Sequence, residues 1–159
     1  FKLAIGYAKE CGADLIVGTD PDSDRVGILV KNDKGEYVTF TGNQVGTLLS
    51  EYILSALAEK DAVPKDGYIV KTIVTTNIIQ AICDAYGIEM KEVLTGFKFI
   101  GEKIKESEET GIGTYIFGFE ESYGYLKWRF ITRRTELLYL SRWTTSTRSM
   151  DTIKKKLCL

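Results

Sequence analysis

The sequence predicts an α/β fold, a three-layer α/β/α arrangement around a mixed, mostly parallel sheet that is incomplete at both ends. Short apolar runs rich in β-branched residues alternate with segments whose apolar residues recur at helical spacing. This alternation favours a parallel sheet covered by helices. The polar motifs of the chain come directly after the apolar runs, and open α/β sheets bind ligands at the carboxyl ends of their strands.

The first forty residues are expected to form one helix and three short strands. Helical spacing predicts a helix over residues 2–11, and Gly12 is a natural stop. One face of this helix carries Leu3, Ala4, Tyr7, Ala8 and Cys11. Strands are expected over residues 14–18, 27–31 and 36–40, and a turn joins the last two into a hairpin.

From residue 41 the chain is expected to alternate between helices and strands. The first helix begins near Thr41, and its predicted buried stripe is Val45, Leu48, Leu49, Tyr52, Ile53 and Ala56. Further helices are predicted over residues 78–86, which Gly87 ends, and from 97 to about 109. Strands are predicted over residues 68–74, 88–94 and 115–118.

The composition is that of an ordinary globular protein, and it excludes several functions. The 159 residues include 21 basic and 22 acidic side chains, so nothing indicates a nucleic-acid partner or a membrane surface. No apolar run approaches the length of a membrane span. The chain has no histidine, which excludes a His-based triad. Cys11, Cys83 and Cys158 lack paired spacing, which suits a reducing cytoplasm.

The loop from Asp20 to Arg25 is the first candidate site. Asp20, Asp22 and Asp24 stand at alternate positions directly after a predicted strand. Three carboxylates held close together repel one another unless a cation lies between them, and hard oxygen ligands favour Mg2+ or Ca2+. Arg25 follows at once, and a guanidinium beside a metal suits a phosphate group. The loop therefore indicates a site for a metal and a phosphate.

The same loop has two other interpretations. Asp-Pro-Asp-Ser-Asp is also good turn chemistry, because Asp and Ser side chains bond to nearby backbone. A calcium EF-hand requires Gly at the sixth loop position and Glu at the twelfth. Counted from Asp20, those positions hold Arg25 and Lys31, so the EF-hand is excluded.

Three motifs in order resemble the α-D-phosphohexomutases, the phosphoglucomutase/phosphomannomutase family. They are similar to the family's metal loop, its third-domain substrate motif and its sugar-recognition loop. In this chain they are Asp20-Pro21-Asp22-Ser23-Asp24-Arg25-Val26-Gly27, Thr95-Gly96-Phe97-Lys98-Phe99-Ile100-Gly101 and Gly118-Phe119-Glu120-Glu121-Ser122-Tyr123-Gly124-Tyr125. The resemblance covers about residues 1 to 126. It implies that residues 1–40 end domain two and that residues 41–126 are a truncated domain three.

The resemblance implies a reaction and a role for each motif. The family moves a phosphate between C1 and C6 of glucose or mannose phosphate, through an enzyme phosphoserine and a bisphosphate intermediate. The three aspartates would hold Mg2+, and Arg25 would contact the phosphoryl group. Glu120 and Ser122 would bind sugar hydroxyls. Thr95 and Gly96 would shape the pocket, and Lys98 would act with Arg25 as a catalytic cation.

The chain departs from the family pattern in two places. The phosphoserine motif Thr-Ala-Ser-His-Asn-Pro does not occur in it, so turnover by this chain alone is expected to be negligible. After Leu126 the family's Arg-Asp-Lys-Asp stretch is replaced by a run rich in Arg, Thr and Ser. If the codons for residues 130–136 and 149–155 are read from their third base, they can encode amino-acid segments that resemble the family's sequence. Residues 127–159 are therefore predicted to be a frameshifted tail, the alternative being a genuine divergent tail.

Two other functions were kept as alternatives. A metal-dependent glycosyltransferase of the Asp-x-Asp type also places acidic residues after a strand, but it gives the motifs near Gly96 and Glu120 no role. A non-catalytic remnant that binds sugar phosphate is the second alternative. It predicts weak binding of Mg2+ or sugar phosphate and no turnover.

Overall fold

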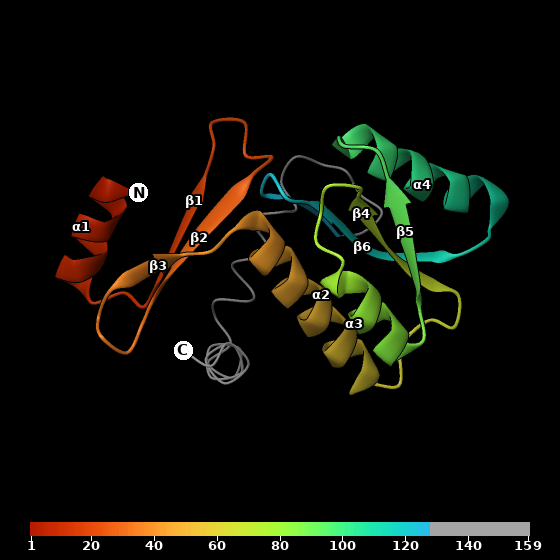
Figure 1. Ribbon diagram of the computed structural model, residues 1–159, viewed down its shortest axis with the longest axis horizontal. Helices are drawn as coiled ribbons and strands as arrows, with labels where there is room; N and C mark the ends of the chain where they lie inside the picture. The colour runs from red at the N-terminus through yellow and green to blue at the C-terminus, as the bar shows by residue number, and fades with distance from the viewer. Residues whose placement is uncertain (128–159) are drawn as a thin grey trace. The chain divides into compact units, whose positions relative to one another are not determined.

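The computed structural model describes residues 1–127, and these fall into two compact units, residues 1–40 and residues 41–127 (Figure 1). Each unit is described by itself. The predicted frameshifted tail lies outside the described residues from residue 128 onward. In the described part of the chain, no helix is long and apolar enough to cross a membrane.

The first unit is a helix followed by a three-stranded antiparallel sheet. Helix α1 (Lys2–Cys11) ends at Gly12, which takes the left-handed conformation with φ 69°. Strands β1 (Leu15–Thr19), β2 (Val26–Lys31) and β3 (Tyr37–Thr39) follow, in the sheet order β1-β2-β3. The predicted helix, its stop and the hairpin of β2 and β3 are all present.

A small apolar cluster holds the first unit together. It is built from Ala8 of α1, Ile16 of β1 and Leu29 of β2, and Tyr37 packs against it. The Tyr37 hydroxyl donates a hydrogen bond to the Ala13 carbonyl over 2.6 Å. The predicted apolar face of α1 is only partly buried, because Leu3 is 81% exposed and Tyr7 is 69% exposed. Of that face, Ala4 and Ala8 meet the cluster, and Ile5 packs beside them.

The second unit contains a four-stranded mixed sheet in the order β5-β4-β6-β7. Strand β4 (Gly67–Thr72) pairs in parallel with β5 (Glu89–Val93) on one side and with β6 (Thr114–Glu120) on the other. Strand β7 (Gly124–Leu126) is antiparallel to β6. Every residue of the central strand β4 is buried. The mostly parallel α/β sheet expected from the sequence is confirmed in this unit.

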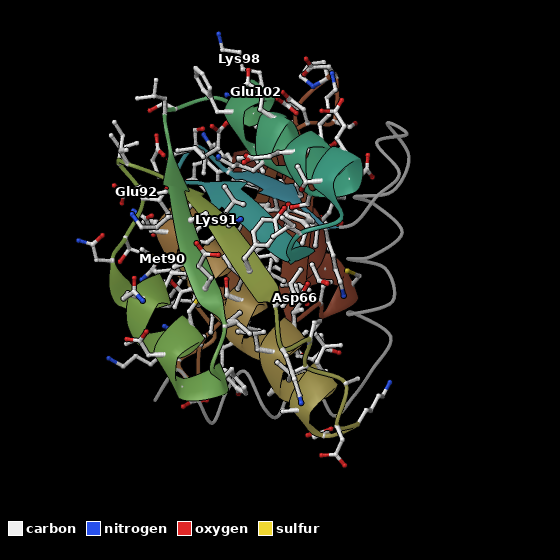
Figure 2. The ribbon with its side chains drawn as sticks, turned by 90° about the vertical axis from the view of Figure 1, so that its right-hand side faces the viewer. Asp66, Met90, Lys91, Glu92, Lys98 and Glu102 are labelled. Carbon is white, nitrogen blue, oxygen red and sulfur yellow. The ribbon has the colours of Figure 1, made fainter. Side chains whose placement is uncertain are left out.

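Helices cover both faces of this sheet. Helix α4 (Phe97–Thr110) lies on one face, and helices α2 (Gly42–Ala58) and α3 (Ile78–Tyr86) lie on the other (Figures 1 and 2). Ile100 and Ile104 of α4 pack with Tyr68, Val70 and Val93. On the other face α2 approaches β6 closely: a Cβ added at Gly46 would lie 2.0 Å from the Phe119 ring. The unit is therefore a three-layer α/β/α sandwich.

The ends of the helices follow from local chemistry. Thr41 and Gln44 form a reciprocal capping box at the start of α2, in which each side chain accepts from the other residue's backbone N–H. Helices α3 and α4 end at Gly87 and Gly111, both in the left-handed conformation. Just before α3, the Thr76 hydroxyl accepts from the Ile78 N–H over 3.3 Å.

Two predictions about the second unit were wrong in detail. The buried face of α2 includes Gly46, Ser50 and Leu54, whereas Leu48 and Leu49 of the predicted stripe are half-buried. The stripe is turned because small residues let the helix approach β6. Strand β6 is also longer than predicted and ends at Glu120, so that residue belongs to the strand. The short strand β7 was not predicted.

Candidate functional site

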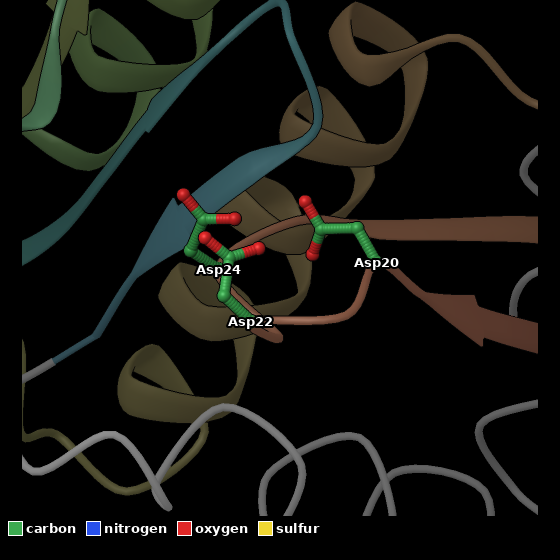
Figure 3. A group of neighbouring side chains, drawn as sticks. All are labelled: Asp20, Asp22 and Asp24. Carbon is green, nitrogen blue, oxygen red and sulfur yellow. The ribbon is translucent and has the colours of Figure 1, made fainter.

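The first candidate site is the loop that joins β1 to β2. Thr19 and Val26 are paired across the two strands, so the loop between them closes into a small space. Ser23 takes a left-handed φ of 59°, and its N–H donates to the Asp20 carbonyl over 3.1 Å. This tight turn aims three carboxylates at one another. Asp20, Asp22 and Asp24 each offer an oxygen, and these oxygens all lie within 4.8 Å of one another (Figure 3).

Arg25 partly neutralises this cluster. Its Nε donates to Asp20 Oδ2 over 2.7 Å, and its backbone N–H donates to Asp20 Oδ1 over 3.2 Å. Desolvation pushes the pKa of the Asp20 carboxyl up, but the hydrogen bonds from Arg25 outweigh it and the pKa is lowered. Desolvation raises the pKa of the Asp24 carboxyl, and the nearby Asp20 carboxylate raises it further. The carboxylates of the cluster repel one another, and a bound cation would reduce this repulsion.

The donor set fits a hard divalent cation. All three side chains offer carboxylate oxygens, and neither sulfur nor nitrogen belongs to the cluster. Asp20 is half-buried, while Asp22 and Asp24 are exposed, so the cluster is open to solvent and ligands on one side. More than half of the Arg25 side chain is exposed, although its Nε is engaged with Asp20.

The second candidate site is the turn between β6 and β7. Glu120 pairs with Gly124, and residues 121–123 form the turn between them. Tyr123 takes a left-handed φ of 71°, which is uncommon for a residue with a large side chain. Glu120 is only 8% exposed, and among the described residues its Oε2 has no hydrogen-bond partner. Ser122 is half-buried beside it in the chain.

The motif that follows β5 lies next to this turn. Gly96 takes φ 121° and starts α4, a conformation that favours glycine. A Cβ added at Gly124 would lie 2.1 Å from the Phe97 ring, so the start of α4 packs directly on β7. Thr95 is exposed. Lys98 is also exposed, and its ammonium lies 4.6 Å from the centre of the Phe99 ring (Figure 2).

The structure thus groups the predicted residues by unit. The first unit brings together the three aspartates and Arg25. In the second unit, β5 and β6 both end at the carboxyl edge of the sheet, which places the Thr95–Gly96 turn beside the turn that carries Glu120 and Ser122. Phe97 and Phe99 pack on the core cluster.

The sequence analysis missed a buried polar group at the same edge. Lys71 of β4 is 0% exposed, and its ammonium contacts Glu92 and two backbone carbonyls. Thr72 Oγ1 donates to the Glu121 carboxylate, and Thr75 Oγ1 lies 3.5 Å from the same oxygen. A lysine within the apolar run Tyr-Ile-Val-Lys-Thr was the one signal that could have revealed it.

An open α/β unit with polar turns after its strands, and a carboxylate loop whose oxygens suit a hard cation, are typical of the class of proteins that bind ligands at the carboxyl ends of strands. Comparison with known proteins narrows this class. A sequence model described as phosphoglucomutase/phosphomannomutase, alpha/beta/alpha domain III, matches residues 41–154. The match extends beyond the described residues, and the frameshifted tail stays a prediction.

Curated relatives agree with this match. The phosphoglucomutase of Staphylococcus haemolyticus (strain JCSC1435) is 37% identical over 126 residues, which are 79% of this chain and 22% of that protein. The phosphoglucomutase of Staphylococcus aureus (strain USA300) is 36% identical over 131 residues, 82% of this chain and 23% of that protein. The chain therefore spans less than a quarter of the length of these relatives. It belongs to the phosphoglucomutase/phosphomannomutase family, the α-D-phosphohexomutases.

Solved structures show the same fold. A phosphoglucomutase/phosphomannomutase family protein from Burkholderia thailandensis has a TM-score of 0.56 at 19% identity, covering 77% of this chain and 23% of that one. An N-acetylphosphoglucosamine mutase from Aspergillus fumigatus, in complex with GlcNAc-6P and magnesium, has a TM-score of 0.55 at 15% identity. That match covers 77% of this chain and 24% of the other.

Proposed function

We propose that this chain is part of a phosphohexomutase that moves a phosphate between C1 and C6 of glucose or mannose phosphate through a bisphosphate intermediate. The observation that carries the proposal is the buried Glu120 carboxylate, whose Oε2 has no hydrogen-bond partner among the described residues. A buried anionic oxygen without a donor costs free energy, so a site that keeps one is expected to receive donors from a ligand.

Sugar hydroxyls are donors suited to Glu120. Vicinal hydroxyls present two O–H groups close together, and a carboxylate accepts both without donating in return. Ser122, two residues further on, adds a hydroxyl that can donate or accept. We propose that Glu120 and Ser122 bind the hexose ring in this way. Thr95 and Gly96 then form the neighbouring wall of the pocket, where the glycine lets backbone approach the ligand.

In each unit, taken by itself, we assign the positive charge to phosphate binding. Lys98 is exposed at the first turn of α4 and can reach a phosphate as a flexible point charge. In the first unit, Asp20, Asp22 and Asp24 would hold Mg2+, which when bound neutralises charge on a phosphoryl group. Arg25 keeps the Asp20 carboxylate oriented through its Nε and leaves much of its guanidinium accessible to a phosphate oxygen.

We propose that the isolated 159-residue chain binds ligand but does not turn it over. The family's nucleophile is the serine of Thr-Ala-Ser-His-Asn-Pro, and this sequence contains no histidine and no such motif. Phosphotransfer through a phosphoserine therefore needs a segment that these residues do not supply. A location in the cytoplasm remains a prediction from the cysteine pattern.

The test is calorimetric titration of glucose 6-phosphate and mannose 6-phosphate into the chain and two charge-matched variants. Glu120→Gln weakens the acceptor in the turn. Glu109→Gln makes the same change on the exposed surface of α4, where the Glu109 carboxylate forms an ion pair with Lys105. Because a hydrogen bond to a charged group contributes about 1.5–3 kcal/mol, Glu120→Gln should weaken binding by about tenfold or more. Glu109→Gln should leave binding unchanged.

Binding of neither sugar phosphate, or equal binding by both variants, would contradict the proposal. A preference for a nucleotide sugar such as UDP-glucose would instead favour an Asp-x-Asp glycosyltransferase, which the family match does not favour. Weak binding with no turnover after the missing motif is restored would identify a non-catalytic remnant.

A further inference from the structure

We propose that Glu121 is a positioning residue: Thr72 and Thr75 clamp its carboxylate, and the clamp holds the adjacent turn so that Glu120 and Ser122 face the sugar. This inference rests on the proposed function, because it takes that turn to be the sugar site. It gives a role to the hydrogen-bonded group of Thr72, Thr75 and Glu121 at the end of β4, which is not itself proposed to contact the sugar.

The clamp is a compact set of three side chains. Thr72 Oγ1 donates to Glu121 Oε2 over 3.1 Å, and Thr75 Oγ1 lies 3.5 Å from the same oxygen. The two hydroxyl oxygens are 2.7 Å apart. Each hydroxyl has one hydrogen, so the consistent assignment is a relay in which Thr75 donates to Thr72 and Thr72 donates to Glu121. Thr72 is 0% exposed and Thr75 is 4% exposed, so water does not compete for these bonds.

Lys71 holds the backbone of the two threonines of the clamp. Its ammonium donates to Glu92 Oε2 over 2.5 Å, to the Thr75 carbonyl over 3.2 Å and to the Thr72 carbonyl over 3.4 Å. An ammonium has three hydrogens, and these three acceptors use all of them. A fully buried charge is tolerated only with such partners. Lys71 therefore holds the backbone of both threonines in place.

The turn is confined from the other side by α2. A Cβ added at Gly42 would lie 2.0 Å from the Glu121 carbonyl oxygen and 2.9 Å from the Tyr123 nitrogen. The peptide of Glu121 thus lies between the first residue of α2 and the end of β4. Thr72 therefore holds the Glu121 side chain, and Gly42 of α2 confines the Glu121 backbone.

This grip has a consequence for Glu120. Its Oε2 has no partner in the described part of the chain, so nothing on the Glu120 side chain holds that oxygen in place. Glu120 is the last residue of β6 and Glu121 follows it directly, so the clamp on Glu121 holds the peptide next to Glu120 in place. A carboxylate whose backbone is fixed before the sugar arrives lowers the cost of binding.

The test compares two double variants of the full chain. Thr72→Val with Thr75→Val removes both hydroxyls at nearly equal volume, and Thr72→Ser with Thr75→Ser keeps both. Thr114→Val is the matched control, because it removes a hydroxyl that donates to Asp66 at the opposite end of β6. The measurements are glucose 6-phosphate affinity by calorimetry and hydrogen–deuterium exchange at the amides of the 121–123 turn.

The valine pair should weaken glucose 6-phosphate binding by about fivefold to tenfold and speed amide exchange in the turn by a similar factor. The serine pair should restore both values, and Thr114→Val should change neither. A merely structural role predicts equal effects of the valine and serine pairs on the turn, or exchange that rises throughout the unit. Either result would overturn the inference.

The two proposals fail in different ways. If the unaltered chain does not bind glucose 6-phosphate, or Glu120→Gln binds it equally well, the proposed function fails. If Glu120→Gln weakens binding but the valine pair does not, only the positioning role of Glu121 fails. Amide exchange in the turn tests the clamp even without ligand: unchanged exchange in the valine pair would refute it.

Discussion

Replacing Gly42 by alanine should both destabilise the second unit and displace the turn of residues 121–123. Gly42 is the buried first residue of α2. A Cβ added at Gly42 would lie 2.0 Å from the Glu121 carbonyl oxygen and 2.7 Å from the Glu121 carbonyl carbon. Real Cβ atoms essentially never come within 3.0 Å of a neighbour, so α2 or the turn must move by about 1 Å. The obstacle is backbone, and no side-chain rotation can relieve it.

Two opposing contributions decide whether Gly42→Ala raises or lowers the free energy of unfolding. Alanine is favoured over glycine in a helix by at most about 1 kcal/mol, and less at the first position. Overpacking a buried site costs about 1–3 kcal/mol, and a clash this short with backbone belongs at the upper end. The net loss should be about 2 kcal/mol. Gly101→Ala in α4 should do the opposite, because nothing lies within 4 Å of its added Cβ.

Urea unfolding followed by circular dichroism measures both variants. With a slope of about 2 kcal/mol per molar urea, Gly42→Ala should lower the midpoint by about 1 M and Gly101→Ala should raise it by a few tenths. Gly42→Ala should also weaken glucose 6-phosphate binding, since it displaces the peptide next to Glu120. A stable Gly42→Ala variant with unchanged binding would refute the argument, as would shifts of the same sign in both variants.

Three further predictions concern other parts of the chain. Burial raises the pKa of the Cys83 thiol to about 11, whereas Cys11 is exposed. Alkylation at mildly alkaline pH should therefore modify Cys11 much faster in the folded chain, and peptide mapping that finds equal rates would contradict the burial of Cys83. Thr41→Ala breaks the capping box with Gln44 and should cost about 1 kcal/mol in urea unfolding, and no change would mean that the cap contributes little. DNA sequencing across the codons for residues 118–159 should reveal, in a shifted reading frame, an amino-acid sequence that resembles the family. One continuous reading frame that matches related genes would contradict the predicted frameshift.

The sequence predicted the order of the elements well because their periodicity is local. The β-branched run around Val70 and the helical spacing after Thr41 each predicted the correct element. The buried face of α2 could not be predicted in the same way. Hydrophobicity favoured Leu48 and Leu49, but contact with β6 selected Gly46 and Ser50 because they are small, and the Ser50 hydroxyl bonds to the Gly46 carbonyl.

Strand β7 was missed because its turn lacks the usual sequence signal. A three-residue hairpin turn normally places Gly or Asn at the left-handed position, and here Tyr123 occupies it. The candidate site residues were predicted from spacing and resemblance, and they stay predictions. The clamp around Glu121 depends on pairing between β4 and β6, which are far apart in the sequence, so its partners could not be inferred from the chain alone.

The central claim is that the loop from Asp20 to Arg25 binds a divalent cation for phosphohexomutase chemistry. Titration of Mg2+ into the chain by calorimetry tests it most directly, with Asp22→Ala and Asp33→Ala as a matched pair. Both variants remove one exposed carboxylate from the first unit, but only Asp22 belongs to the cluster within 4.8 Å. We predict that the unaltered chain and Asp33→Ala bind one Mg2+ equally well and that Asp22→Ala loses most of this binding. If Asp22→Ala binds Mg2+ as well as Asp33→Ala does, the metal assignment is wrong.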